Sequence, residues 1–333
     1  MSLHRFPSNH LFYQEHSQRY MQYLLDMNSI IDAICRAAPG IKQRTIESLL
    51  SKLKINGAPS TDRNQYLQYA CELTVTGYLC RVLEAHAFDY EYPGNNGKDV
   101  DSSIEINGVR FNIEVKCPNP KRKAGQHFDS SLNLRTHGRI DDFVNLKQDI
   151  NCLARTLNFD AFTITPNSDH NIKEALIDAA NKFPRPVTDN QLNCVVLCGD
   201  DGVSLQHYYH CLFGAQGLFT DKSFHDNPRD YAEVDAVILT NLRHRHDRYL
   251  SSSKLSSPWL FESAFNLIVR NTSQPERSSN NLIALKGLIP NHNNSFCRYN
   301  VPGDAPPDVL DGIKLAYYVY DKVPQLDANC FDS

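Results

Sequence analysis

Residues 98–118, KDVDSSIEINGVRFNIEVKCP, decide the fold of this chain, because they predict a β-hairpin with a two-residue turn. Asn107-Gly108 is the dipeptide that a type I′ turn favours, since both central residues need positive φ. Counting outward from this turn pairs Glu105 with Arg110 and places Asp101 opposite Glu114. The same register separates an apolar face of the hairpin from a polar face.

Each predicted face has a consistent chemical character. The apolar face is expected to hold Val100, Ile104, Ile106, Val109, Phe111, Ile113 and Val115. The polar face is expected to hold Asp99, Asp101, Glu105, Arg110, Asn112, Glu114 and Lys116. One face should therefore pack on a core while the other carries polar chemistry.

Two carboxylates that face each other across the hairpin need a compensating cation. Asp101 and Glu114 would have Cβ atoms about 5 Å apart, which is repulsive without positive charge between them. Carboxylate oxygens at this spacing suit Mg²⁺ or Mn²⁺, and Lys116 would lie beside the same pocket. Such a metal lowers the pKa of a bound water, so the pattern predicts hydrolysis of phosphodiester bonds.

An Asp on one strand, a hairpin, and Glu-x-Lys on the next strand together resemble the PD-(D/E)XK nuclease superfamily. The resemblance implies an α/β, restriction-endonuclease-like mixed sheet flanked by helices. It makes Asp101 and Glu114 the ligands of Mg²⁺ or Mn²⁺ with the Val115 carbonyl, and Lys116 the catalytic lysine. A further glutamate from the preceding helix would be Glu72, in the helical run 65–86. No proline precedes Asp101, and Asp99 is a second candidate for the first acid, although the hairpin register favours Asp101.

The alternative interpretation is a solvated hairpin with ordinary cross-strand ion pairs. It explains Glu105 opposite Arg110 well. It explains Asp101 opposite Glu114 poorly, because like charges in facing positions destabilise a sheet.

Basic residues near the hairpin are candidates for phosphate contacts. A basic stretch runs from Lys116 to Arg139, and a helix over 140–153 would follow it; the candidates are Lys121, Arg122, Lys123, Lys147 and Gln148. A second basic segment, LRHRHDR at 242–248, is interpreted as a solvated loop. Its His244, His246 and Asp247 match a transition-metal site less well than a polar loop.

Composition is compatible with a nuclease but does not identify one. The 333 residues carry a net charge of -4, so nucleic-acid contacts must come from local patches. Ten cysteines without a C-x-x-C pair predict a reducing compartment and buried thiols rather than disulfides, with Cys194 and Cys198 on one side of a core strand. The sequence shows neither a phosphate-binding loop nor an apolar run of membrane-spanning length, so we expect a cytoplasmic protein without ATPase activity or a membrane partner.

Hydrophobic periodicity predicts the elements along the rest of the chain. A helical N-terminal region over 1–58 should precede a nuclease-like α/β domain over 59–333 with C-terminal elaborations. Predicted helices cover 20–34, 46–53, 66–83, 172–183 and 259–268, and predicted strands cover 162–165, 194–197, 234–240 and 314–320. Predicted loops cover 184–192, 221–230, 251–258, 271–280 and 289–307, and the aromatic residues Tyr208, Tyr209, Trp259, Tyr317 and Tyr318 are assigned to the core.

These observations predict a metal-dependent nuclease that acts on DNA, with endonuclease and exonuclease activity both open. Restriction, phage defence and mobile-element biology are the settings that such an enzyme would fit. One alternative is a nuclease-fold protein that binds nucleic acid without cutting it. Another is a structural or interaction protein that docks a partner on residues 11–54. A homodimer and a complex with a partner protein are both compatible with the sequence.

Overall fold

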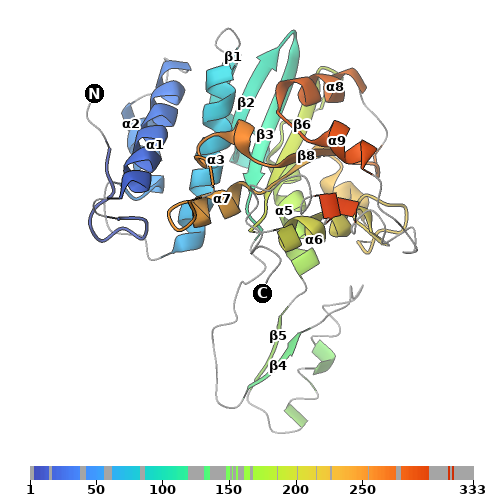
Figure 1. Cartoon of the computed structure of the whole chain (residues 1–333). Coiled ribbons are helices and arrows are strands. Elements are labelled where there is room, and N and C mark those ends of the chain that lie inside the picture. The colour runs from blue at the N-terminus through green and yellow to red at the C-terminus, as the bar shows by residue number, and fades with distance from the viewer. Residues whose placement is uncertain are drawn as a thin grey trace.

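The structure is a computed structural model of the whole chain (Figure 1). It describes residues 4–14, 17–37, 43–55, 62–82, 87–118, 131–135, 148–150, 152, 155–156, 161–165, 168–185, 187–200, 202–214, 216–225, 227–253, 255–274, 279–299, 314–315 and 317–318.

A six-stranded mixed sheet lies at the centre of the fold (Figure 1). Its order is β1 (Ala87–Pro93), β2 (Asp99–Ile106), β3 (Val109–Lys116), β6 (Gln191–Cys198), β7 (Ala236–Thr240) and β8 (Asn266–Arg270). The β1–β2 and β2–β3 pairs are antiparallel, β3–β6 and β6–β7 are parallel, and β8 is antiparallel to β7. The predicted mixed sheet flanked by helices is thus confirmed. A separate parallel pair joins β4 (Ser131–Arg135) to β5 (Ala161–Thr165).

The β2–β3 hairpin has the predicted register near its turn. Asn107 and Gly108 have φ of 52° and 77°, and Glu105 pairs with Arg110. Regular pairing ends at Ser102 opposite Ile113, so the ladder is interrupted just before Asp101.

The predicted apolar face changes sides beyond this interruption. Val100 packs in the apolar cluster of helices α5 (Ser168–Lys182) and α6 (Gly202–Phe213), whereas Ile104 and Phe111 pack in the cluster of helix α3 (Arg63–Val82). The prediction that Val100 shares a face with Ile104 is therefore wrong, because simple alternation does not continue across the irregular position.

Helices cover both faces of the sheet. Helices α3 (Arg63–Val82) and α8 (Ser279–Leu288) pack on one face, and α5 (Ser168–Lys182) and α6 (Gly202–Phe213) pack on the other. Every residue of β6 is buried, as expected for a strand covered on both sides. For the same reason Asn112 and Glu114 are buried, although the sequence assigned them to a polar face.

The N-terminal helices share one apolar core with α3. Helix α1 (Gln18–Ala37) and helix α2 (Gln43–Lys52) contribute buried residues to a cluster that also contains Tyr66 and Trp259. The helices predicted over 20–34, 46–53 and 66–83 are confirmed, while the domain division at residue 58 stays a prediction.

The basic segment at 242–248 is a helix that is buried over residues 242–246, so its interpretation as a solvated loop is wrong. Helix α7 (Leu242–Arg248) packs against α1 and α3, with His246 between Tyr23 and Thr74. The Arg245 guanidinium donates hydrogen bonds to the carbonyl oxygens of Ser256, Ser257 and Ser263 at 2.5–3.1 Å. These carbonyls provide the polar partners that a buried arginine requires.

Three further predictions about the C-terminal part are wrong. The segment predicted as a helix over 259–268 contains a short 3-10 helix, Phe261–Ser263, followed by β8, because its apolar residues complete the sheet beside β7. The loop predicted over 289–307 contains helix α9 (Asn293–Arg298). Within the strand predicted over 314–320, residues 314–315 and 317–318 are helical.

The sequence analysis also missed strand β1, which lies where the sequence indicated only the end of a helix and a loop.

Core assignments from composition are mostly confirmed. Tyr208, Tyr209, Trp259 and Tyr318 are buried, whereas Tyr317 is exposed. Cys194 and Cys198 lie on the same side of β6, in the cluster that faces α3. The described cysteines are free thiols. In the described part of the chain, no helix combines the length and apolar character needed to cross a bilayer.

Candidate active site

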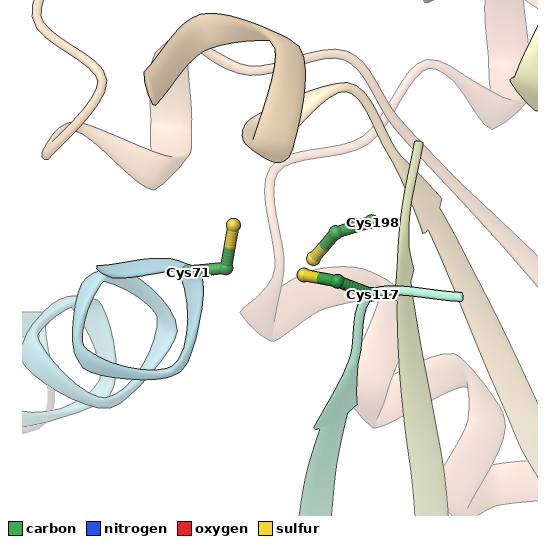
Figure 2. Close-up of side chains that lie close together, drawn as sticks. All are labelled: Cys71, Cys117 and Cys198. Carbon is green, nitrogen blue, oxygen red and sulfur yellow. The ribbon is translucent and has the colours of Figure 1, made fainter. Parts of the chain in front are cut away.

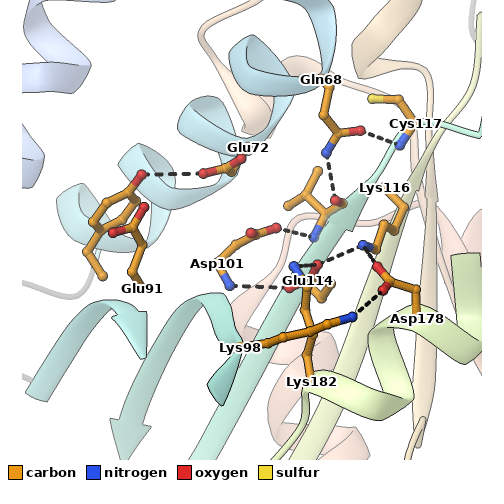
Figure 3. A network of polar contacts seen from close by, with 12 residues as sticks. Gln68, Glu72, Glu91, Lys98, Asp101, Glu114, Lys116, Cys117, Asp178 and Lys182 are labelled. Atoms are coloured by element: carbon orange, nitrogen blue, oxygen red, sulfur yellow. Dashed lines mark hydrogen bonds and ion pairs between the residues drawn. The ribbon is translucent and has the colours of Figure 1, made fainter. Parts of the chain in front are cut away.

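Four residues named from the sequence come together at the interrupted end of the hairpin (Figure 3). Glu72 projects from α3, Asp101 from β2, and Glu114 and Lys116 from β3. Glu72 and Glu114 are 4% and 1% exposed, so both carboxylates are removed from bulk water.

Asp101 and Glu114 are tied to each other's strands by reciprocal hydrogen bonds. The Val115 backbone N–H donates to Asp101 Oδ2 at 2.7 Å, and the Asp101 backbone N–H donates to Glu114 Oε2 at 3.3 Å. Side-chain oxygens thus replace the backbone pairing that stops at Ser102. The replacement fixes both carboxylates at the point where the two strands separate.

Gln68 binds the C-terminal end of β3, beyond the point where the pairing of β3 with β2 stops. Its Nε2 donates to the Val115 carbonyl oxygen at 2.8 Å, and its Oε1 accepts from the Cys117 backbone N–H at 2.8 Å. The amide therefore acts as a neighbouring strand would. The Val115 carbonyl, predicted as a metal ligand, is engaged by this bond. Gln68 was missed by sequence reasoning, although it lies four residues before Glu72 and so on the same face of the helix.

Two lysines neutralise the buried Glu114. Lys182 Nζ lies 2.5 Å and Lys116 Nζ lies 2.9 Å from Glu114 Oε1. Lys116 also pairs with Asp178, which in turn is 3.1 Å from Lys98 Nζ. Positive charge is thus present on Glu114 in the form of two ammonium groups. Lys182 and Asp178 were missed because α5 lies far along the chain from the hairpin.

A second charged group surrounds Glu72. Lys52 Nζ lies 3.2 Å from Glu72 Oε1 and 2.8 Å from Glu91 Oε1, and the Tyr90 hydroxyl donates to Glu72 Oε1 at 3.3 Å. Glu91 has a φ of 50°, a conformation that a residue other than glycine seldom adopts. This irregularity in β1 lies beside the interruption at Asp101 and directs the Glu91 side chain toward Lys52.

Burial and neighbouring carboxylates raise the pKa values of Asp101 and Glu72. Burial raises the pKa of Asp101 well above its usual range, and the negative charges of Glu72 and Glu114 raise it further. Burial also raises the pKa of Glu72, against the opposing effect of Lys52. The raised pKa values of Asp101 and Glu72 mean that nearby positive charge does not fully offset the cost of ionising these two acids.

Lys116 and Asp178 form an ion pair in which each side chain stabilises the charge of the other. Burial lowers the pKa of Lys116, but the charge of Glu114 and the hydrogen bonds to Asp178 and Glu114 leave it above its usual value. Burial raises the pKa of Asp178, yet its hydrogen bond to Lys116 brings that pKa to about 2. Lys116 therefore keeps its proton at neutral pH.

Among the described residues, the group whose ligand atoms lie close enough together to hold a metal ion consists of three cysteines, and the three acids do not form such a group. Glu72, Asp101 and Glu114 offer carboxylate oxygens from three separate elements, which is the chemistry that Mg²⁺ and Mn²⁺ prefer. The raised pKa of Asp101 marks the position where added positive charge would be most stabilising. Asp99, the other candidate for the first acid, is exposed and pairs through its backbone with Pro93.

The remaining predicted residues do not extend this site in the described structure. Lys121, Arg122, Lys123 and Lys147 lie outside the described residues, and Gln148 is exposed. Within α7, His244 Nδ1 donates to the Asp200 carbonyl, whereas His246 lies between Tyr23 and Thr74. The two histidines and Asp247 do not gather as ligands there.

A cluster of three thiols lies next to the carboxylates and was missed by sequence reasoning. The Sγ atoms of Cys71, Cys117 and Cys198 all lie within 4.8 Å of one another (Figure 2). The absence of a C-x-x-C pair concealed the cluster, because its members come from three elements. Cys71 precedes Glu72 and Cys117 follows Lys116 in the sequence. The thiol cluster and the carboxylate site are therefore linked directly through the backbone.

Comparison of the chain with protein-family models, with curated proteins and with solved structures gave no match.

Proposed function

We propose that this protein is a metal-dependent nuclease of the PD-(D/E)XK type that hydrolyses phosphodiester bonds in DNA. The observation that carries the proposal is the convergence of Glu72, Asp101 and Glu114 with the charged Lys116. Helix α3 supplies the first of these acids just before the strands that supply the others. The order of elements supports a restriction-endonuclease-like core, since a helix and a parallel strand follow the hairpin.

Each residue would have a distinct part in the reaction. Glu72, Asp101 and Glu114 would hold Mg²⁺ or Mn²⁺, which supplies a Lewis acid for the phosphate and lowers the pKa of a bound water. Lys116 would orient the attacking water and stabilise charge that develops on the phosphate. Its ion pair with Asp178 keeps the ammonium directed toward Glu114. Gln68 is a positioning residue, because it fixes the backbone on both sides of Lys116.

DNA cleavage tests the proposal directly. Purified protein is incubated with plasmid, linear duplex, single-stranded DNA and RNA in Mg²⁺, Mn²⁺ or EDTA. We expect cleavage of DNA that requires the metal, and a loss of roughly 100-fold or more in Asp101→Asn and Lys116→Met. Glu105→Gln is the matched control, because Glu105 lies on the same hairpin in an exposed pair with Arg110.

Cleavage that persists in both site variants would refute the assigned residues. Cleavage of RNA alone would correct the substrate. If no substrate is cut, calorimetry measures whether the wild-type protein binds divalent metal. Absence of metal binding would then count against the nuclease.

One observation favours a second candidate, a nuclease-fold protein that binds nucleic acid without cutting. Lys182 and Lys116 already neutralise Glu114, so this carboxylate is satisfied without a metal. Intact DNA binding together with no Mg²⁺ binding, in both wild type and Lys182→Met, would select this candidate over the nuclease.

A further inference from the structure

The three thiols of Cys71, Cys117 and Cys198 gather through the topology of the sheet. β3 and β6 are parallel and in register, with Lys116 beside Leu197, so Cys117 and Cys198 are the next residues at the same edge. Cys71 reaches this edge from α3 (Figure 2). Gln68, one turn earlier in α3, holds the Cys117 backbone in place. The approach of the three sulfurs therefore follows from fixed elements.

The separations suit a metal bound by thiolates. A tetrahedral ion with metal–sulfur bonds of about 2.3 Å separates its sulfurs by roughly 3.8 Å. The observed limit of 4.8 Å is about 1 Å longer, which side-chain rotation can close. Cys71 and Cys198 are fully buried, while Cys117 is partly exposed. An ion would enter on the Cys117 side.

The surroundings of the thiols favour a divalent ion. Arg243, which is 5% exposed, lies beside Cys117 and pairs with Asp200. Three thiolates with a divalent ion carry a net charge of about -1, whereas a monovalent ion would leave about -2, so a divalent ion leaves less buried charge beside the Arg243–Asp200 pair. Sulfur donors select thiophilic ions over Mg²⁺ or Mn²⁺.

We propose that Cys71, Cys117 and Cys198 form a binding site for one divalent thiophilic ion of the zinc class. The ion ties α3 to the ends of β3 and β6. Three protein ligands leave a fourth position for water. Because Cys71 adjoins Glu72 and Cys117 adjoins Lys116, an occupied thiol site would hold the backbone of the carboxylate site.

Cobalt substitution tests the thiol site without any assay of activity. Metal-free, fully reduced wild-type protein is titrated with Co²⁺, and then with Zn²⁺ in competition. We expect a sulfur-to-cobalt charge-transfer band that saturates at one equivalent and disappears when zinc is added. The absence of this band in the wild-type protein would overturn the proposal, whatever the variants do.

Single substitutions identify the ligands. Cys117→Ser and Cys198→Ser should weaken zinc binding by roughly 100-fold or more and abolish the band. Cys194→Ser is the matched control, since Cys194 is a buried thiol on the same strand and face but outside the cluster. Unchanged binding in Cys117→Ser, or loss in Cys194→Ser with its fold intact by circular dichroism, would overturn the assignment.

Two further outcomes separate this site from other chemistry. Zinc binding should be unchanged in Asp101→Asn, so a failure of the proposed nuclease activity would leave the thiol site standing. A disulfide between two of the three cysteines, found by mass spectrometry of protein isolated without reductant and accompanied by no metal binding after reduction, would replace the metal site with a redox pair.

Discussion

At the scale of single residues, Asp101 would couple binding of the proposed metal to release of a proton. Its pKa is raised by burial and by two neighbouring carboxylates, so the metal-free site favours the protonated acid. A bound cation would reverse that preference and release the proton. We therefore expect the affinity for Mn²⁺ to rise with pH above the ordinary carboxyl pKa of about 4.

Calorimetry in buffers of different ionisation enthalpy measures the released proton. Glu105→Gln should release as much as the wild type, since Glu105 is exposed and remote from the acids. The absence of proton release in the wild-type protein would contradict the coupling.

The same residue should oppose folding when no metal is present. An acid whose pKa is higher in the folded protein than in the unfolded chain loses stabilisation as pH rises from the unfolded pKa through the folded pKa. Asp101→Asn removes this loss, and its amide oxygen can still accept from the Val115 N–H. We expect a higher Tm for Asp101→Asn near pH 7 in EDTA, by about 2–4 °C for each kcal/mol gained.

Scanning calorimetry of wild type, Asp101→Asn and Glu105→Gln at several pH values checks this expectation. The advantage of Asp101→Asn should shrink toward pH 4. A variant that is less stable than wild type at every pH would show that the carboxylate is stabilising.

Sequence reasoning found the acids of the site and Lys116 but not the other partners of these acids. The Asn107-Gly108 turn fixes the register and so places Asp101 near Glu114, because hairpin geometry is local. Lys182 and Gln68 meet β3 only through tertiary packing, and no local rule relates their positions to it. Simple alternation also could not reveal that Asp101 interrupts the ladder.

At the scale of one element, the packing of α7 depends on the planar shape of the Arg245 guanidinium. Arg245 is buried and donates to three carbonyls of the segment 256–263, a geometry that needs the planar guanidinium. Arg245→Lys keeps the charge but leaves carbonyls unsatisfied, so we expect a loss of roughly 3 kcal/mol in the free energy of unfolding. Urea denaturation measures it.

Arg248→Lys is the control within the same helix. The Arg248 side chain is 61% exposed and lies 3.6 Å from Asp247, a long contact, so its replacement should change stability by less than about 0.5 kcal/mol. Equal losses in the two variants would mean that charge, and not geometry, holds this arginine.

The failures at element scale have a common cause. The segment around β8 and the helix α7 each combine apolar residues with polar ones in short runs, where helix, strand and loop cannot be distinguished by periodicity. β8 is a strand because β7 offers an unpaired edge, and α7 is a helix because the N-terminal core covers it. The sequence of β8 does not indicate that β7 will lie beside it, and the sequence of α7 does not indicate that the N-terminal core will cover it.

At the scale of the whole molecule, His246 joins three helices. Its Nδ1 lies 3.0 Å from the Tyr23 hydroxyl of α1, and its Nε2 lies 2.9 Å from Thr74 Oγ1 of α3. Burial, together with the smaller effect of the Arg245 charge, lowers the pKa of His246 to about 3. Because the unfolded histidine has a pKa near 6.5, stability should fall as pH drops from about 6.5 toward 3.

Replacement of this histidine tests its share of the acid sensitivity. His246→Gln should reduce the slope of unfolding free energy against pH by up to about 1.4 kcal/mol per pH unit in that range. His4→Gln serves as the control, since His4 contacts Asn28 through its backbone alone. A slope unchanged in His246→Gln would place the acid sensitivity elsewhere.

The architecture could be predicted only in part. The alternation of helical and strand patterns indicates a mixed sheet with helices, as observed. The neighbours β3 and β6 could not be paired from sequence, because a long crossover separates them. The cluster of Cys71, Cys117 and Cys198 depends on that pairing, which is why a search for closely spaced cysteines could not find it.

The distance along the chain between Glu114 and Lys182 sets an order of events during synthesis. The lysine follows the glutamate by 68 residues, which a ribosome needs several seconds to add at about 5–20 residues per second. Until Lys182 is added, the emerging hairpin lacks the complete helix α5 and one of the two ammonium groups on Glu114. The strand β6 is synthesised later still. Burial of this carboxylate is therefore a late event, and the nascent hairpin keeps its acidic end in water until α5 arrives.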